Sequence, residues 1–288
     1  MRLGVVTCAK CPNLTVSEQK LIPLLEAHGV MAIPVVWNDP VTNWSTFDCL
    51  LIRSIWDYHL HPEAFVAWLH SLEAHGTKTW NPIPILLRNY HKFYLRDLEE
   101  RGVRIVPTLF QKDSTDAFDR ILSRGWKKGV AKPAISASGF RTETFSVSSQ
   151  GQAKRAIQNA HAQGDFLIQE FMPAIQEAGE LSLIYFNHVY SHAVLKRPRP
   201  GEFRVQAEYG GDALPCQPDE HIIQTAAKIL AHFGNELLYA RVDGIVIDGE
   251  FVLMELELIE PDLFLDSHPG THTRFVESLV SRLRTSSH

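Results

Sequence analysis

The sequence has no long apolar run and no basic excess. No segment approaches about eighteen uninterrupted apolar residues, the length that marks a membrane-spanning helix. The apolar stretch within residues 1–10 is too short for the core of a signal peptide. The 28 Lys and Arg residues stand against 33 Asp and Glu residues, which gives a formal net charge of −5. Because nucleic-acid-binding proteins usually carry a clear basic excess, neither a nucleic acid nor a membrane is expected as a partner.

Cysteine is also scarce, with four residues among 288. That number is small for a secreted disulfide framework, so we expect a reducing, cytoplasmic setting. Cys8 and Cys11 form a lone C-x-x-C pair. Since no second Cys or His pair stands at ligand spacing, the pattern favours two small residues at a strand end over a metal or redox site.

The length exceeds that of one typical domain, so two or three packed subdomains are expected. Short, β-branched, apolar stretches occur at 3–7, 31–37, 48–54 and 77–81. Helical patterns separate these stretches, and the longest of them spans 62–75. This βαβ order predicts an N-terminal α/β domain with a parallel sheet at residues 1–85.

The rest of the chain predicts two α+β lobes, a central one at 86–168 and a C-terminal one at 169–288. The central elements are predicted as helices at 91–100, 115–124 and 152–163 and strands at 103–108, 129–133 and 142–147. The C-terminal elements are predicted as strands at 166–171, 180–186, 189–195, 240–247 and 251–259 and helices at 220–233 and after Pro269. The fold class is therefore a combination of α/β and α+β.

Two acids lie side by side on the last predicted strand. Glu255 and Glu257 are two residues apart, so their side chains project to the same face. If residues 248–250 form the preceding loop, Ile247 pairs with Phe251, and the same register places Asp243 opposite Glu255. A strict two-residue turn would instead turn Asp243 to the other face.

Apolar residues surround these three acids, and charged groups are seldom buried without a partner. A solvated, acid-rich strand face is the alternative. We favour a site in which Asp243, Glu255 and Glu257 hold Mg²⁺ or Mn²⁺, because these hard cations prefer carboxylate oxygens and also bind phosphate.

A lysine within an apolar strand indicates a phosphate site upstream. Lys132 lies in the stretch 130–133, and the following loop contains Ser136, Ser138 and Gly139. Backbone amides and hydroxyls of such a loop can bind phosphate oxygens beside the lysine. The sequence contains neither G-x-x-x-x-G-K-[ST] nor G-x-G-x-x-G, so a Walker P-loop and a dinucleotide-binding fold are not expected.

Several segments, in this order, resemble the ATP-grasp superfamily, and more closely its branch related to prokaryotic glutathione synthetase and D-cycloserine synthetase. The resemblance spans nearly the whole chain and depends on order and spacing rather than on one decisive motif. The segments are 53–58 (RSIWDY), 89–92 (NYHK), 130–133 (VAKP), 169–173 (QEFMP), 179–182 (GELS), 201–204 (GEFR) with Gly210-Gly211, 241–244 (RVDG) and 255–257 (ELE).

The resemblance implies that an N-terminal substrate domain is followed by two lobes that enclose ATP. Lys92 and Lys132 would bind phosphates, and the loop 136–140 would close over them. The backbone of the hinge formed by Glu170, Phe171 and Met172 would bind adenine. Glu180 would bind the ribose, although Glu177 stands close enough in sequence to take that role.

The resemblance also implies the catalytic and metal-binding groups. Arg204 and Arg241, with Lys196, would stabilise charge on the transferring phosphoryl group and the acyl phosphate. The metals would be held by the three acids described above. The family often has Asn at the position of Glu257, so the number of metals is left open.

Arg53, Trp56, Asp57 and Tyr58 follow the third predicted strand, at the sheet edge where α/β proteins usually bind ligands. We expect Arg53 to bind a substrate carboxylate and Asp57 an amine. A surface arginine beside a core tryptophan is an equally weighted alternative. Substrate recognition from glutathione synthetase cannot be transferred, because 15–18 (TVSE) replaces its acidic pair in the first loop.

The predicted function is that of an ATP-dependent ligase or cyclising synthetase. A small amino-acid-like carboxylate would be activated as an acyl phosphate and attacked by an amine-type nucleophile, with release of ADP and phosphate. In the D-cycloserine synthetase-like version, the nucleophile belongs to the same molecule. A small-molecule kinase and a non-catalytic nucleotide-binding protein are the alternatives, and the sequence leaves a homo-oligomer open.

Overall fold

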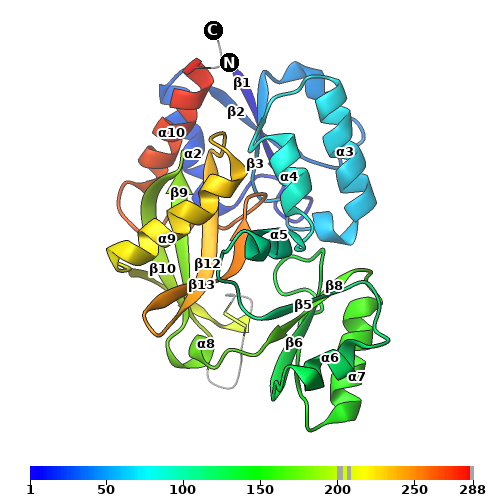
Figure 1. Ribbon diagram of the computed structural model, residues 1–288. Helices are drawn as coiled ribbons and strands as arrows, with labels where there is room; N and C mark the ends of the chain where they lie inside the picture. Colours follow the sequence, from blue (N-terminus) through cyan, green and yellow to red (C-terminus); the bar gives the residue numbers. More distant parts are fainter. Residues whose placement is uncertain (200–203, 206–208, 286–288) are drawn as a thin grey trace.

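The computed structural model describes residues 1–199, 204–205 and 209–285 (Figure 1). The first sheet is parallel and has the strand order β2-β1-β3-β4. Its strands are β1 (Arg2–Thr7), β2 (Met31–Val36), β3 (Cys49–Ile52) and β4 (Thr79–Trp80). The helices around it are α1 (Val16–Gln19), α2 (Leu21–Ala27), η1 (Trp44–Thr46), η2 (Tyr58–Leu60), α3 (Pro62–Ala74) and α4 (Ile83–Asn89). The predicted N-terminal parallel sheet is therefore confirmed.

The second sheet is antiparallel and has the order β5-β8-β6-β7. Its elements are β5 (Thr108–Gln111), α6 (Ala117–Ser123), β6 (Lys128–Pro133), β7 (Glu143–Ser146), α7 (Gln150–His161) and β8 (Phe166–Glu170), preceded by α5 (Tyr94–Glu100). The predicted strand 103–108 is wrong: the strand begins at Thr108, and only an isolated bridge joins Ile105 to Leu253. The strand β8 spans the expected lobe boundary and pairs within this sheet.

The third sheet has the order β11-β10-β9-β12-β13. Its elements are α8 (Ala174–Glu177), β9 (Glu180–Phe186), β10 (Val189–Arg197), β11 (Asp212–Cys216), α9 (Glu220–Leu230), η4 (Ala231–Phe233), β12 (Tyr239–Ile247) and β13 (Glu250–Glu257). The edge strand β11 has no counterpart in the sequence prediction. It is mostly exposed and contains Pro215, so it lacks the alternating pattern that marks a strand.

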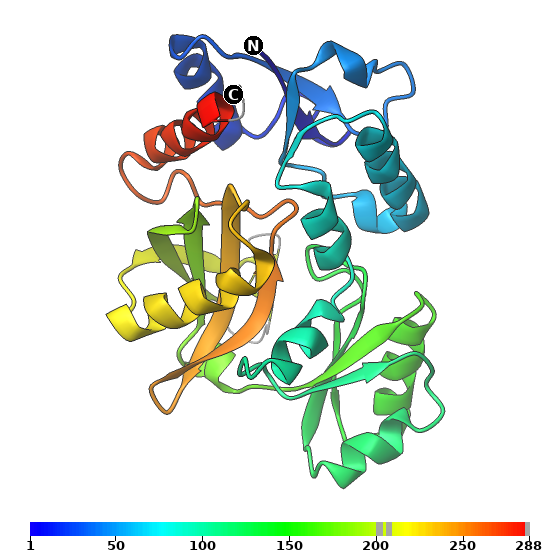
Figure 2. The ribbon, with the colours of Figure 1, turned by 45° about the horizontal axis from the view of Figure 1, so that its top comes forward.

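The last helix, α10 (Thr271–Thr285), packs beside α2 and contacts β9 and β10 of the third sheet (Figure 2). Phe275 and Leu279 of α10 share a hydrophobic core with Leu3 of β1 and Phe186 of β9. The C-terminal part of the chain therefore holds the first and third sheets together. In the described part of the chain, no helix has the length and apolar character needed to cross a membrane.

A β-bulge sets the register of the β12–β13 hairpin. Ile247 pairs with Glu250 across a two-residue turn, Asp248-Gly249, in which both residues have positive φ. The predicted pairing of Ile247 with Phe251 is therefore wrong. Asp243 nevertheless pairs with Glu255, because the register shifts between Asp243 and Gly244 and Met254 has no partner on β12.

Asn81 connects the N-terminal domain to the third sheet. Its side-chain amide donates to the carbonyls of Tyr239 and Leu258, and its Oδ1 accepts from the amides of Leu238 and Tyr239. Asn81→Leu should lower the free energy of unfolding by about 2–4 kcal/mol, because buried backbone groups lose their partner. Urea unfolding measures this loss. The exposed Asn13→Leu should change it by less than about 0.5 kcal/mol, and equal losses would refute the connecting role.

Candidate active site

A cavity of about 440 Å³ lies where the three parts of the chain meet. The predicted site residues that line it are Trp56, Tyr58, Lys92, Lys132, Ser136, Ser138, Gly139, Glu170, Met172, Glu180, Lys196, Arg204, Arg241, Asp243, Glu255 and Glu257. Phe171, Glu177, Arg53 and Asp57 do not line it. Its volume is in the range of small-molecule and cofactor sites.

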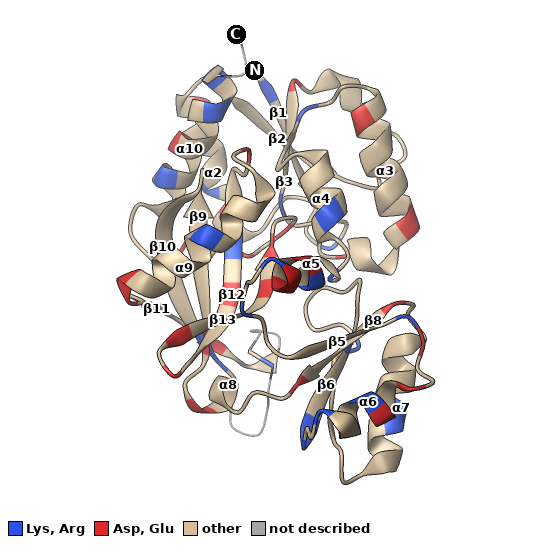
Figure 3. Ribbon diagram, in the orientation of Figure 1, with Lys and Arg blue, Asp and Glu red and all other residues tan. Residues whose placement is uncertain are grey.

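The register of the third sheet explains why its charged side chains gather. Directly paired strand residues project to the same face, as do residues two apart on one strand. The pairs that share the cavity face are Arg241 with Glu257, Asp243 with Glu255, Asp243 with Ser182, and Lys196 with Glu180. The opposite face is apolar and packs against α9. Basic and acidic positions accordingly stand next to each other along β12 in Figure 3.

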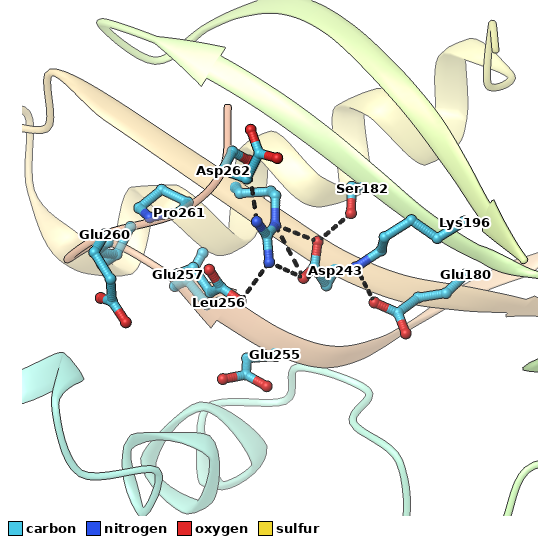
Figure 4. Close-up of polar contacts among 12 residues, drawn as sticks. Glu180, Ser182, Lys196, Asp243, Glu255, Leu256, Glu257, Glu260, Pro261 and Asp262 are labelled. Atoms are coloured by element: carbon cyan, nitrogen blue, oxygen red, sulfur yellow. Dashed lines mark hydrogen bonds and ion pairs between the residues drawn. The ribbon is translucent and has the colours of Figure 1, made fainter. Parts of the chain in front are cut away.

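Asp243 is held by cations on two sides (Figure 4). Arg241 donates to its carboxylate from Nε and Nη2 at 3.0–3.1 Å, and Lys196 Nζ stands 3.2 Å away. The Ser182 hydroxyl donates from 2.5 Å. Burial raises the pKa of Asp243, but the charges of Arg241 and Lys196 outweigh it and lower the pKa to about 2. Asp243 therefore remains ionised and its oxygens are occupied.

The two predicted phosphate lysines are both buried in this cavity. Lys92 Nζ is 2.6 Å from Glu255 Oε1 and 2.9 Å from the Ser136 carbonyl. This contact joins the lysine that follows α4 to both the acid strand and the loop. Burial lowers the pKa of Lys132, and that of Glu255 is lowered because Lys92 and Lys132 outweigh its burial. The cations thus face the acids across the cavity.

Some of the residues predicted to bind adenine and ribose line the cavity, and others do not. Phe171 is buried and its ring lies 3.5 Å from Lys128 Nζ, so its side chain packs outside the cavity. Glu180 is buried and forms an ion pair with Lys196 at 2.5 Å. Glu177 is exposed at the end of α8. The geometry favours Glu180 over Glu177 as the acid nearer to a bound ligand.

The predicted catalytic Arg204 also lines the cavity, and its guanidinium lies 3.5 Å from the centre of the Tyr209 ring. The Tyr209 hydroxyl reaches the carbonyl of Ser138 at 3.4 Å. The loop that contains Ser138 is therefore contacted from the C-terminal lobe as well as by Lys92. The segment 201–203, which belongs to the resemblance, lies outside the described residues.

Asp57 stands apart from the position predicted for an amine-binding group. Its carboxylate accepts a hydrogen bond from Trp37 Nε1 at 2.7 Å within the N-terminal domain, and it lines neither of the two cavities. Trp56 and Tyr58, its neighbours in sequence, do reach the main cavity. Their shared position after a strand end could not predict which of these side chains would face the cavity.

Arg53 lines a smaller adjoining cavity of about 120 Å³, which shares Trp56 and Asp262 with the main one. The guanidinium is 3% exposed; Nε is 3.2 Å from Glu18 and Nη2 donates to the Pro261 carbonyl at 2.7 Å. Nη1 is buried without a hydrogen-bond partner. One donor of Arg53 therefore remains available to a ligand, because buried polar groups are normally satisfied.

Sequence reasoning missed two acids, the buried Glu18 and the half-buried Glu260. Glu18 forms a capping box with Thr15 and pairs with Arg53, and the T-x-x-E spacing was a signal for the capping box only. Glu260 lines the main cavity. The sequence signal for Glu260 was only that another acid stands three residues after Glu257. The strand has ended there, so the side-chain direction could not be inferred from the alternation of strand residues.

The pKa values of two cavity acids at and just after the end of β13 are raised. Burial raises that of Glu257 to about 7 even though Arg241 forms an ion pair with it. Burial, with the charges of Glu257 and Glu255, raises the pKa of Glu260 to about 8. Both groups therefore hold protons at a pH where an unfolded chain would have released them.

Glu260→Gln should therefore stabilise the protein above pH 8 but not at pH 5. The folded pKa of Glu260, about 8, lies above its ordinary value of 4.5. Folding stability therefore falls as the pH rises from 4.5 to about 8. Glutamine removes that fall and should raise the unfolding temperature by about 3 °C at pH 8.5. Thermal unfolding of both proteins from pH 5 to 9 measures the effect, and a constant difference at every pH would contradict it.

The acid set suits a hard cation shared with phosphate. Among the described residues, no three His, Cys, Asp or Glu side chains form a ready cage for a metal ion. Mg²⁺, however, usually takes only one or two carboxylates together with phosphate oxygens. Glu255 and Glu257 fit this requirement, because both project into the cavity from β13. Asp243 is the least available of the three, since its cations already occupy its oxygens.

Comparison with known proteins gives consistent results. The family model for the N-terminal domain of D-cycloserine synthetase DcsG matches residues 3–81. The cycloserine biosynthesis protein DcsG of Streptomyces lavendulae is 29% identical over 279 residues, covering 91% of this chain and 93% of that protein. The crystal structure of D-cycloserine synthetase DcsG has a TM-score of 0.88 at 26% identity, with 98% of this chain and all of that chain covered.

A more distant likeness extends to other ligases. D-alanine–D-alanine ligase from Bacillus anthracis, in a complex with ATP, has a TM-score of 0.72 at 14% identity, with both chains fully covered. At this identity the likeness concerns the fold alone. The chain therefore has the fold of ATP-grasp ligases, and its sequence and structure are similar to those of D-cycloserine synthetase.

Proposed function

We propose that this ligase uses ATP with Mg²⁺ to activate the carboxylate of a small amino-acid-like substrate. The observation that carries the proposal is one cavity in which Lys92 and Lys132 face the acids of β12 and β13, with the Ser136–Gly139 loop beside them. Such a site suits phosphoryl transfer, in which a protein mainly positions reactants and neutralises charge.

In the proposed reaction, a substrate carboxylate oxygen bonds to the γ-phosphorus of ATP, and ADP leaves. The acyl phosphate is then attacked by an amine, and phosphate leaves. Lys92 and Lys132 would hold the phosphate oxygens, while Arg241 and Arg204, with Lys196, would balance charge that develops during transfer. No side chain needs to form a covalent bond with the substrate.

The metal would be held by Glu255 and Glu257, with Asp243 behind them. When bound with ATP, Mg²⁺ would withdraw charge from the phosphate oxygens. Glu255 already lies against Lys92, so acid and lysine reach the same phosphates. Glu180 would bind the ribose, and the backbone of residues 170–172 would bind adenine.

The substrate would lie between the main cavity and the smaller one. Trp56 borders both cavities, and the unpartnered Nη1 of Arg53 offers a donor to a substrate oxygen. A substrate that spans the two would place its reacting carboxylate toward the phosphates and its other end beside Arg53. We expect a cytoplasmic location, because the proposed reaction consumes ATP.

The likeness to D-cycloserine synthetase supports ring closure as the form of the second step, with the nucleophile in the same molecule. Ligation of two molecules is the other form. A kinase that stops at phosphoryl transfer is a third candidate, but no observation favours it.

The proposal is tested by ADP release with Mg²⁺, ATP and a panel of amino acids, followed by mass spectrometry. The panel contains both enantiomers of alanine, serine and 2,4-diaminobutyrate, whose side-chain amine permits closure of a five-membered ring. A product lighter than its substrate by one water indicates cyclisation, a dipeptide indicates ligation, and added phosphate indicates a kinase. Tight ATP binding without substrate-dependent ADP release would reject catalysis on this substrate class.

A further inference from the structure

Glu260 is an acid on the wall of the main cavity and lies near the N-terminal domain. It follows β13, and its backbone carbonyl accepts a hydrogen bond from Trp56 Nε1 at 3.1 Å. Trp56 borders both cavities, so this bond fixes the backbone of Glu260 beside the place proposed for the substrate. Figure 4 shows its carboxylate turned away from the Asp243 network.

Four other acids that line the cavity are engaged by cations. The ion pairs are Glu180 with Lys196, Asp243 with Arg241 and Lys196, Glu255 with Lys92, and Glu257 with Arg241. Within the described part of the chain, Glu260 has no ion-pair partner. Asp262, which also borders the cavity, is exposed, and its carboxylate accepts from the amide of Phe264. Glu170 also lines the cavity and forms no ion pair among the described residues, but it belongs to the hinge proposed for adenine. Glu260 is therefore the acid on the substrate side of the cavity that is free to exchange a proton with a ligand.

Attack on an acyl phosphate by an amine requires a proton acceptor. An ammonium group has no lone pair, so one proton must leave before nitrogen can bond to carbon. Lysine and arginine side chains in the cavity are charged and cannot accept it. An acid paired with a cation is a weaker base than the same acid without the cation, because the cation stabilises its ionised form.

We propose that Glu260 is the general base for the amine nucleophile, an assignment that rests on the proposed function. Its carboxylate accepts one proton from the ammonium group, and the freed lone pair bonds to the acyl carbon. The bond from that carbon to the phosphate oxygen then breaks, and the second proton lost by nitrogen leaves with inorganic phosphate. The proton on Glu260 returns to solvent after product release.

The surroundings of Glu260 support this role. Burial raises its pKa, the charges of Glu257 and Glu255 raise it further, and Lys92 lowers it, with a result of about 8. Tyr58 and Tyr239 also face this acid, and its charge contributes to the raised pKa values of both hydroxyls. A base is most effective when its pKa lies near the working pH.

The test separates the two half-reactions with hydroxylamine, which is uncharged at neutral pH and needs no base. The panel compound with the largest ADP release is incubated with ATP and Mg²⁺, with and without hydroxylamine, and hydroxamate and amide are quantified. In Glu260→Gln, amide formation should fall by about 10²–10³-fold, whereas hydroxamate formation should stay within about twofold of wild type. Glu260→Asp should recover part of the amide rate.

Amide formation by the wild type should also rise with pH between 6 and 9, and this rise should be absent in Glu260→Gln. The exposed Glu250→Gln, on the strand β13 that precedes Glu260, serves as a control and should match wild type in both assays. An equal fall of amide and hydroxamate would assign Glu260 to phosphoryl transfer and overturn the base assignment, as would an unchanged amide rate. Absence of hydroxamate with the wild-type enzyme would instead reject the acyl phosphate itself.

Discussion

Glu255→Gln is expected to lower substrate-dependent ADP release by about 10²–10³-fold. Glu255 contacts Lys92, and in the proposed reaction its charge would meet both this lysine and a metal-bound phosphate. Glutamine preserves the shape and can still accept a hydrogen bond from Lys92, so the loss should come from the missing charge. Steady-state ADP release over a range of Mg²⁺ concentrations measures it.

A fold defect would mimic this result, so the thermal unfolding of the variant has to be compared with that of wild type. Glu250→Gln, on the exposed end of the same strand, should leave ADP release unchanged. A residual rate within tenfold of wild type at saturating Mg²⁺ would show that Glu255 is not needed for phosphoryl transfer.

Arg241→Met is expected to destabilise the fold by about 3–5 kcal/mol, because removing one partner of a buried ion pair leaves its charges uncompensated. Arg241 contacts both Asp243 and Glu257 and also donates to the Asp262 carbonyl. Lys196 remains beside Asp243. Glu257, however, loses the one ion-pair partner that it has among the described residues. Urea unfolding at pH 7 gives the free energy.

An exposed pair is the matched control for this variant. Lys20 and Asp266 are 2.5 Å apart, with about half of each side chain exposed. Lys20→Met should cost less than about 1 kcal/mol, as exposed pairs usually do. If Arg241→Met costs no more than Lys20→Met, the buried network is not a source of stability. Its loss of activity would then have to come from the missing charge alone.

The sequence was sufficient for the order of the elements, because apolar periodicity and turn residues act locally. It predicted β9 with the same bounds as the structure, and the acids of β12 and β13 on one face. The reason given for the acids was wrong, however, since a two-residue turn and a bulge replace the longer loop. Turn length can be inferred from Asp-Gly, but a bulge depends on packing between strands.

The charged side chains of the N-terminal domain were harder to predict. Arg53 and Asp57 were both expected to face a substrate. They are four residues apart on an irregular segment, where no regular alternation of side chains predicts that they point in different directions. Asp57 turned out to satisfy Trp37, while Arg53 is paired with Glu18 across a distance of 35 residues in sequence. Such long-range pairs are set by the tertiary fold. The roles assigned to the cavity residues stay predictions that the variants above can test.

The unpaired Met254 has a consequence for the comparison of sequences. The strand β13 holds one residue more than its partner β12 between the turn and the acids. A relative that lacked this residue would keep its acids opposite the same aspartate, yet its chain would be one position shorter. A gapless alignment of the two hairpins would then match Glu255 to the wrong neighbour. Homologous acids in this hairpin should therefore be assigned by their strand partners, with a one-residue gap permitted at Met254.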